Sequence, residues 1–323
     1  MRVVVLGAGG IGGTIGARLH QSGYDVALVA RGAHGEAIRE RGLSFATPEE
    51  QVTLRIPAYT HPRELEWRAG DVVVLAAKSQ DTEAAARDLA ACAGQVPVVS
   101  AQNGVANERA LARWFDDVHA MCVMMPTAHL EPGVVQAHSA AATGILDLGR
   151  FPDGVDALDE ELAAALRASR FECVARPDIM RWKYRKLLNN LGNAVQALCG
   201  SALDSEAGLA ALELLETEAE AVLAAAGVEP VTDEEDRARR ADHLRIEGIS
   251  GADRAGGSTW QSLQRGSGIE TDFLNGEIAL LGRLYGVPTP ANARIQALMT
   301  QAALRHDPPG QLGAADLLAA LSG

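Results

Sequence analysis

The sequence is poor in cysteine, and its few cysteines form no pairing motif. Among 323 residues there are four, Cys92, Cys122, Cys173 and Cys199, all far apart and without a CxxC pair. This spacing is typical of reduced, mostly buried thiols in a cytosolic protein, and it excludes a disulfide framework or a cysteine-ligated zinc site. The eight histidines contain no HxxxH or HExxH pair, so we assign no metal to the protein.

Positive charge is also scarce. There are 29 lysines and arginines against 42 aspartates and glutamates, which gives a formal net charge of −13, and no basic cluster is long enough to follow a phosphate backbone. Nucleic acid is therefore excluded as a partner. An anionic substrate would need cations placed locally, because the field of the whole chain opposes it.

Long apolar runs are missing as well. No stretch is long enough to span a bilayer, and the glycine-dense segment after the first residues lacks the layout of a signal peptide. Hydrophobic residues make up 47% of the chain and charged residues 22%, an ordinary globular balance. We expect a soluble cytoplasmic protein without a membrane partner, long enough to form two domains.

The first half of the chain alternates between strand and helix patterns. The run "RVVVL" at 2–6 is β-branched, as in a strand buried on both faces, and it is followed by a glycine-rich turn and a helix that Gly23 closes. Further strands are predicted at 24–31, 71–79 and 96–104, with added strands in 118–148 and a helix at 158–170. The alternation predicts an α/β fold with a Rossmann-type doubly wound parallel sheet.

After Pro177 strand patterns nearly vanish. The predicted helices are 178–199, 206–226, 232–247, 258–264 and 269–285. Gly227 and Gly286 stand where C-terminal caps belong. We therefore predict a dinucleotide-binding domain at 1–177 and an all-helical substrate domain at 178–323.

Two segments of the helical half have a more specific prediction. Thr232 and Glu235 have the spacing of a capping box, and the charged run 232–240 is predicted to form a solvated helix face. The small-residue segment 250–259 is predicted to be a flexible loop.

The glycine-rich turn has the sequence "GAGGIG". It comprises Gly7, Ala8, Gly9, Gly10, Ile11 and Gly12. The G-x-G-x-x-G motif follows a strand and opens a helix, which is the context in which its backbone approaches a pyrophosphate held at the helix N-terminus. A glycine-rich packing turn without a ligand is the alternative.

The second strand ends in Arg31, where an NAD-binding protein would have an acidic residue for the ribose hydroxyls. A guanidinium suits a 2′-phosphate, so we predict NADPH as the cofactor, with a plain surface charge as the alternative. Lys78 and Asn103 end the third and fourth strands and should line the ligand crevice. A solvated strand end and a turn residue before Gly104 are the corresponding alternatives.

The segment "KYRKLLNNLGNAV", 183–195, combines lysines and asparagines with leucines. On a helix with Lys186 at zero, Asn190 lies at about +40°, Asn193 at about −20° and Lys183 at about +60°. The leucines lie on the other side, so the helix has a separate Lys/Asn stripe. Asparagine is a weak helix former, so helix formation does not explain its presence on this stripe. The asparagines therefore indicate hydrogen bonding to a specific group.

Taken together, these segments resemble the ketopantoate reductases (2-dehydropantoate 2-reductases). The similar motifs, in order, are "GAGGIG", Arg31, "LAAKS" with Lys78, "QNG" with Asn103, "YRKLLNN", "STWQSLQRGSGIETDFLNG" and "YGVPTPAN". The ordered set covers nearly the whole chain.

The resemblance implies NADPH-dependent reduction of 2-dehydropantoate to (R)-pantoate, a step of pantothenate and coenzyme A biosynthesis. Lys186 would be the general acid at the carbonyl oxygen, where a cation also stabilises developing negative charge. Glu270 would accept a hydrogen bond from the distal hydroxyl of the substrate and Ser258 would contact its carboxylate. Asn190, Asn193 and Asn103 would position the substrate, and Asn103 would also help position the nicotinamide or the lysine.

Several alternatives stay open at this point. Lys183 lies on nearly the same helix face as Lys186, and Ala194 stands where the family often has a second asparagine. Glu270 could serve a helix dipole and Ser258 an N-cap. A reductase of another small 2-oxo or 3-hydroxy acid is the first alternative function, and a redox-silent NADPH-binding protein is the second. A homodimer is compatible with the broad alanine and leucine faces of the helical half.

Overall fold

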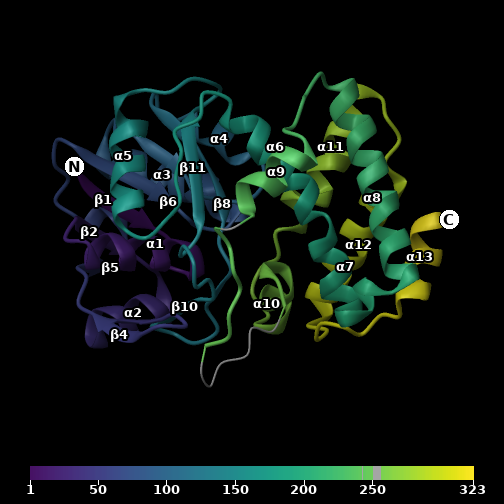
Figure 1. Ribbon diagram of the computed structural model, residues 1–323, viewed down its shortest axis with the longest axis horizontal. Helices are drawn as coiled ribbons and strands as arrows, with labels where there is room; N and C mark the ends of the chain where they lie inside the picture. Colours follow the sequence, from purple (N-terminus) through teal and green to yellow (C-terminus); the bar gives the residue numbers. More distant parts are fainter. Residues whose placement is uncertain (242, 250–255) are drawn as a thin grey trace. The chain divides into compact units, whose positions relative to one another are not determined.

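The protein forms two compact units in the computed structural model, which describes residues 1–241, 243–249 and 256–323 (Figure 1). One unit comprises Met1–Lys183 and Thr232–Arg254, and the other comprises Tyr184–Val231 and Ala255–Gly323. These units differ from the predicted domain ranges 1–177 and 178–323, because 178–183 and 232–254 belong with the sheet. Part of the loop predicted at 250–259 lies outside the described residues.

A sheet of seven strands organises the first unit. Its order is β11-β8-β7-β6-β1-β2-β5, in which all neighbours are parallel except β11 and β8. The strands are β1 (Arg2–Leu6), β2 (Asp25–Val29), β5 (Ala58–Tyr59), β6 (Asp71–Leu75), β7 (Val98–Ser100), β8 (Val118–Met124) and β11 (Ile145–Arg150). The parallel-dominated sheet confirms the Rossmann-type doubly wound α/β prediction.

The core follows from the alternation of side chains along β1. Val3 and Val5 belong to a cluster with Ile15 of α1 and with residues of the second sheet, whereas Val4 and Leu6 belong to another cluster with Leu89 of α3. Every residue of β1 is buried. A strand buried on both faces requires a continuous apolar run, which is why "RVVVL" was recognisable.

The first unit also contains a second sheet, of four strands. Its two strands within 118–148 were predicted, but its two strands within 43–54 were not. Its order is β4-β3-β10-β9, formed by β3 (Leu43–Ala46), β4 (Gln51–Leu54), β9 (Thr127–Ala128) and β10 (Val134–Ala137). The helices of this unit are α1 (Gly10–Gln21), α2 (Gly32–Arg41), α3 (Thr82–Ala93), α4 (Asn107–Leu111), α5 (Ala157–Ala168), the start of α6 (Ile179–Asn190) and α9 (Asp233–Arg240). Helix α5 confirms the prediction at 158–170.

Helix α9 returns to the sheet unit through a buried ion pair. Arg239 donates from Nε and Nη2 to the two carboxylate oxygens of Asp147 on β11, at 2.9 and 2.7 Å, and Arg176 contacts the same carboxylate at 2.6 Å. Asp147 is fully buried. The prediction of a solvated face for 232–240 was therefore wrong at Arg239, although the capping box of Thr232 and Glu235 is confirmed.

The second unit is helical. It contains α7 (Gly192–Cys199), α8 (Glu206–Ala225), α10 (Ser258–Gln264), α11 (Asn275–Tyr285), α12 (Pro290–Arg305) and α13 (Ala314–Ser322). The predicted helix 178–199 is divided at Leu191, within the poorly helical sequence Asn-Asn-Leu-Gly-Asn. Gly227 and Gly286 follow their helices with positive φ angles, as predicted.

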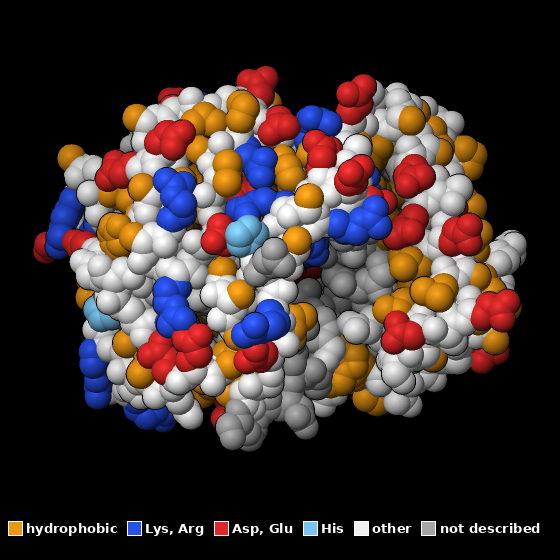
Figure 2. All heavy atoms as spheres, viewed as in Figure 1, with side chains coloured by type: hydrophobic (Ala, Val, Ile, Leu, Met, Phe, Trp, Pro, Cys, Tyr) orange, Lys and Arg blue, Asp and Glu red, His pale blue; other side chains and the backbone are white. Residues whose placement is uncertain are grey.

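The surface and the thiols agree with the composition. On the face drawn in Figure 2, lysine and arginine side chains are interspersed with acidic ones, and that face presents no broad field of positive charge. The four cysteines are free, and three of them are buried. Among the described residues, no helix combines the length and the apolar character that a membrane span requires.

Candidate functional site

The glycine turn after β1 has the close contacts that its motif predicts. Gly7 has φ +101°, and a β-carbon there would lie 2.7 Å from the backbone nitrogen of Ala77. A β-carbon at Gly12 would lie 2.1 Å from the carbonyl oxygen of Gly7. Both glycines are therefore required by the turn and by the packing of helix α1 on the sheet.

Gly9 differs, because the space beside it is open. The nearest atom to a β-carbon on Gly9 would be a ring carbon of His129, at 3.9 Å. Gly9 is also the N-cap of α1, and neither a capping side chain nor an acidic residue stands in the first turn. The turn formed by Gly7, Ala8, Gly9, Gly10, Ile11 and Gly12 thus leaves N–H groups and room for an anionic pyrophosphate.

Arg31 is the N-cap residue of α2, directly after the second strand. Its guanidinium is 69% exposed and lies 3.2 Å from the carboxylate of Asp81, which is itself 40% exposed. A pair of this exposure contributes little to stability, so the guanidinium can turn to another anion at small cost.

Lys78 and Asn103 follow the carboxyl ends of β6 and β7. Lys78 is the N-cap residue of a 3₁₀ turn at Ser79–Asp81. The carbonyl oxygen of Asn103 accepts hydrogen bonds from Asn107 Nδ2 at 2.8 Å and from Ser79 Oγ at 3.3 Å. These bonds tie the two strand ends together, at the edge of the sheet where doubly wound folds bind ligands.

Lys183 and Lys186 have different environments although they share helix α6. Lys183 is 3% exposed; its Nζ donates to the carbonyl oxygen of Gln102 at 3.0 Å and forms a buried ion pair with Glu108. Lys186 is half-buried. Since Lys183 is engaged by a buried carboxylate within the sheet unit, its position is that of a structural cation.

The remaining predicted substrate residues belong to the second unit. Asn190 is buried near the end of α6, and Asn193 lies near the start of α7. A β-carbon at Gly257 would lie 3.7 Å from Asn193 Oδ1, so the start of α10, where Ser258 stands, is close to Asn193. Ser258 is exposed and is not the N-cap, since Gly257 has that place. Glu270 is half-buried; it is the N-cap residue of the 3₁₀ turn Thr271–Phe273 but makes no side-chain capping hydrogen bond to that turn.

Comparison with known proteins identifies the family. The family model "Ketopantoate reductase PanE/ApbA" matches residues 3–153, and the model for its C-terminal part matches residues 178–303. A 2-dehydropantoate 2-reductase of Halobacterium salinarum is 30% identical over 304 residues, which are 90% of this chain and 95% of that protein. The chain belongs to the ketopantoate reductase family.

Solved structures agree with this membership. A PanE/ApbA family ketopantoate reductase from Ralstonia eutropha JMP134 has a TM-score of 0.80 at 29% identity, with 95% of this chain and 99% of that chain covered. D-mandelate dehydrogenase, solved with NADH and anilino(oxo)acetate, has a TM-score of 0.81 at 22% identity over 95% of this chain and 100% of that chain, which indicates a shared fold. This member of the ketopantoate reductase family is an oxidoreductase that acts on CH–OH donors.

Two histidines beside the glycine turn were not found from the sequence. The backbone N–H of Gly133 donates to His34 Nδ1 at 2.8 Å, so His34 carries its proton on Nε2 and donates it to the carbonyl oxygen of Ala8 at 2.7 Å. The ring of His129 lies 4.1 Å from that of His34, centroid to centroid. His34 thus braces the turn from helix α2, and no sequence motif marks it, because its contacts are made across 26 and 99 residues.

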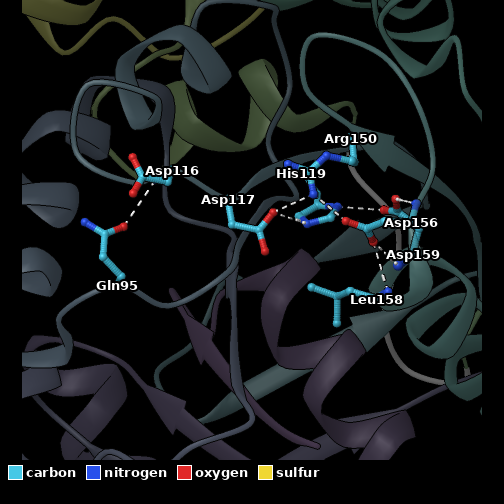
Figure 3. A network of polar contacts seen from close by, with 8 residues as sticks. All are labelled: Gln95, Asp116, Asp117, His119, Arg150, Asp156, Leu158 and Asp159. Atoms are coloured by element: carbon cyan, nitrogen blue, oxygen red, sulfur yellow. Dashed lines mark hydrogen bonds and ion pairs between the residues drawn. The ribbon is translucent and has the colours of Figure 1, made fainter.

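One cluster in the described residues has the geometry of a metal site, and it is occupied by other charges (Figure 3). Ligand atoms of Asp117, His119 and Asp156 lie within 4.8 Å of one another. However, Arg150 forms ion pairs with both aspartates. Both ring nitrogens of His119 also face carboxylates: Nδ1 lies 2.7 Å from Asp159 and Nε2 lies 3.2 Å from Asp117. The cluster is an ion-pair network that links β8 to the N-terminus of α5.

Proposed function

We propose that this enzyme reduces 2-dehydropantoate to (R)-pantoate with NADPH, with Lys186 as the general acid, in pantothenate and coenzyme A biosynthesis. The observation that carries the proposal is the match to proteins named 2-dehydropantoate 2-reductase across both halves of the chain. The family motifs present in the chain supply the residues that the reaction needs.

The residues of the first unit fit a nicotinamide dinucleotide phosphate. The open backbone at Gly9 and the uncapped start of α1 suit a pyrophosphate, and the exposed Arg31 suits a 2′-phosphate better than a bare diol. Lys78 and Asn103, at the ends of β6 and β7, complete the cofactor side. Bound NADPH supplies the hydride.

The proton comes from Lys186. Reducing a 2-oxo acid leaves negative charge on the former carbonyl oxygen, and an ammonium both stabilises that charge and donates the proton. The burial of Lys183 in its pair with Glu108 supports assigning this role to Lys186. Glu270 accepts a hydrogen bond from the distal hydroxyl, Ser258 contacts the carboxylate, and Asn103, Asn190 and Asn193 hold the substrate.

A related reductase acting on another small 2-oxo acid is the second candidate, and Ala194 favours it. Ala194 is 1% exposed inside the helical unit, where it offers no amide to a substrate. Its neighbour Asn193 lies near Gly257 instead, so the second asparagine is displaced by one position. Such a displacement alters the shape of the substrate that can be held more than it alters the proton donor.

Steady-state NADPH oxidation with 2-dehydropantoate, measured against a panel of other 2-oxo acids, tests the substrate. We expect the highest kcat/KM for 2-dehydropantoate. Preference for another 2-oxo acid would support the second candidate, and NADPH binding without turnover of any of them would refute both.

The same assay tests the proton donor. Lys186→Ala should lower kcat by about 10²-fold or more, because no other group replaces the proton donor, while the dissociation constant for NADPH stays unchanged. Arg181→Ala, which removes an exposed cation from the same helix, is the matched control and should keep wild-type kcat. Near-normal turnover of Lys186→Ala would reject the assignment.

A further inference from the structure

A network of buried polar side chains lies beneath the ends of β6 and β7. Its members are Ser79, Thr82, Ser100, Gln102, Asn107, Glu108 and Lys183, each at most 3% exposed. None of them is among the residues assigned to the cofactor or the substrate. Burying polar groups lowers stability unless they are hydrogen-bonded, and apolar side chains would fill the same space at lower cost. A network of this extent therefore indicates a role besides packing.

The side chain of Gln102 fixes the backbone on one side of Lys78. Its Nε2 donates to the carbonyl oxygen of Ala77 at 2.9 Å and to Thr82 Oγ1 at 2.8 Å. Thr82 in turn donates to Asn107 Oδ1 at 2.8 Å. The residue before Lys78 is thereby held against the strand that carries Asn103.

Asn107 fixes the backbone on the other side. Its Nδ2 donates to the carbonyl oxygen of Asn103 at 2.8 Å and to Ser79 Oγ at 3.3 Å. Both neighbours of Lys78 and the backbone of Asn103 are therefore bound to one set of interior side chains. Such partners orient functional side chains without touching a ligand.

Lys183 joins helix α6 to this network. Its Nζ donates to the carbonyl oxygen of Gln102 at 3.0 Å and pairs with the carboxylate of Glu108 on α4. The other oxygen of that carboxylate, Oε2, is buried without a hydrogen-bond partner in the described part of the chain. Lys183 is thus the cation that balances Glu108, and the pair joins the start of α6 to the turn of Asn103.

We propose that Lys183 and Glu108 are positioning residues. Their ion pair anchors the turn that carries Asn103 and the start of α6, the helix on which Lys186 follows one turn later, about 60° around the helix axis. A small misplacement of such groups lowers turnover strongly even when the substituted residue lies away from the chemistry. The kinetic part of this proposal rests on the proposed function, whereas its structural part does not.

The test compares a single and a double substitution. Lys183→Met alone leaves the Glu108 carboxylate buried and uncompensated, so it should lower the melting temperature. Lys183→Met combined with Glu108→Leu removes both charges and should recover most of the melting temperature. We expect kcat of the double variant to stay about tenfold or more below wild type, with the KM for NADPH changed far less.

Hydrogen exchange supplies a readout that does not depend on activity. Backbone amides of 101–108 should exchange faster in the double variant than in the wild-type protein, because the turn has lost its anchor. The matched control removes the buried pair of Arg2 and Asp71, whose Nη2–Oδ2 distance is 2.6 Å, at the opposite end of the strands. Arg2→Met with Asp71→Leu should leave both kcat and the exchange of 101–108 unchanged.

The outcomes separate the two proposals. A double variant with restored stability, wild-type kcat and wild-type exchange overturns the positioning role. A wild-type protein without reductase activity overturns the proposed function, and the exchange of 101–108 then decides the positioning role alone. If the double variant does not fold, Glu108→Gln keeps the shape and weakens the contact with Lys183. It should speed exchange and lower kcat severalfold, and unchanged values of both refute the proposal.

Discussion

The role of Arg31 in ligand binding can be tested separately from its contribution to stability, because its side chain is exposed. Its pair with Asp81 spans 3.2 Å between a largely exposed and a partly exposed side chain, an arrangement that contributes at most about 1 kcal/mol. A substitution here should therefore act on ligand binding without unfolding the protein.

Arg31→Ala should raise the KM for NADPH far more than the KM for NADH, because only NADPH has the 2′-phosphate that a guanidinium binds. The two constants are measured by steady-state oxidation of each cofactor, with Arg39→Ala in the same helix as the control. Equal changes in both constants would contradict the phosphate role.

Lys183 and Lys186 show what the sequence can and cannot tell at the scale of single residues. On a helical projection the two lysines are about 60° apart, so the sequence alone could not distinguish a proton donor from a structural cation. The distinction comes from Glu108, which is 75 residues away in the chain. Motif residues such as Gly7 and Gly12 were found because their spacing forms a known pattern within six residues, whereas the network around Lys183 has no such pattern and is made by tertiary contacts.

Helix α9 illustrates the same limit at the scale of an element. Its capping box was predictable from Thr232 and Glu235, since those residues bond to each other. Its buried side was not, because the bidentate partner of Arg239 is Asp147, which lies on a distant strand. From sequence alone, a run of charged residues is predicted to face solvent, because a buried partner of opposite charge elsewhere in the chain cannot be seen.

Arg239→Leu should lower the free energy of unfolding by about 2 kcal/mol or more, since the buried carboxylate of Asp147 loses its bidentate partner and keeps Arg176 and the backbone N–H of Val174. Arg237→Leu, at an exposed position of the same helix, is the matched control and should change stability little. Denaturant melts of both variants measure the difference. Equal, small effects would mean that α9 is not anchored through this pair.

Long strands that are buried along their whole length were easier to predict than short or half-exposed ones. β1 and β6 are buried along their whole length and appear in the sequence as unbroken β-branched runs. β4 alternates between exposed and half-buried residues, and β5 has two residues, so neither stands out from its surroundings. The break at Leu191 was hidden because residues on both sides of it continue the apolar helical pattern.

For the molecule as a whole, the network of His119 predicts how stability depends on pH (Figure 3). Burial by itself lowers the pKa of His119, but the hydrogen bond that its ring donates to Asp159 and the charges of Asp159, Asp117 and Asp156 outweigh it, so the pKa lies above its ordinary value. The charged imidazole therefore stabilises the folded state fully below the unfolded pKa of about 6.5, and this contribution is lost as the pH rises through the folded pKa.

The difference in free energy of unfolding between wild type and His119→Asn should accordingly be larger at about pH 6 than at about pH 9. Denaturant melts at several pH values measure it, with His20→Asn as the control. A difference that does not vary with pH, or that grows as the pH rises, would show that His119 is not held as an imidazolium.

The return of the chain to the sheet unit after Thr232 has a consequence for synthesis on the ribosome. Ser139 pairs with Ile246, and Glu247 donates its backbone N–H to the carbonyl oxygen of His138, at 2.9 Å. The N-terminal part of the sheet unit leaves the exit tunnel first. Its residues 138 and 139 therefore lack these backbone partners until 246 and 247 have been translated. An N-terminal half released early has the glycine turn but lacks the backbone partners that 246 and 247 give to 138 and 139, so this unit can complete its fold only after the first part of the helical unit has been made.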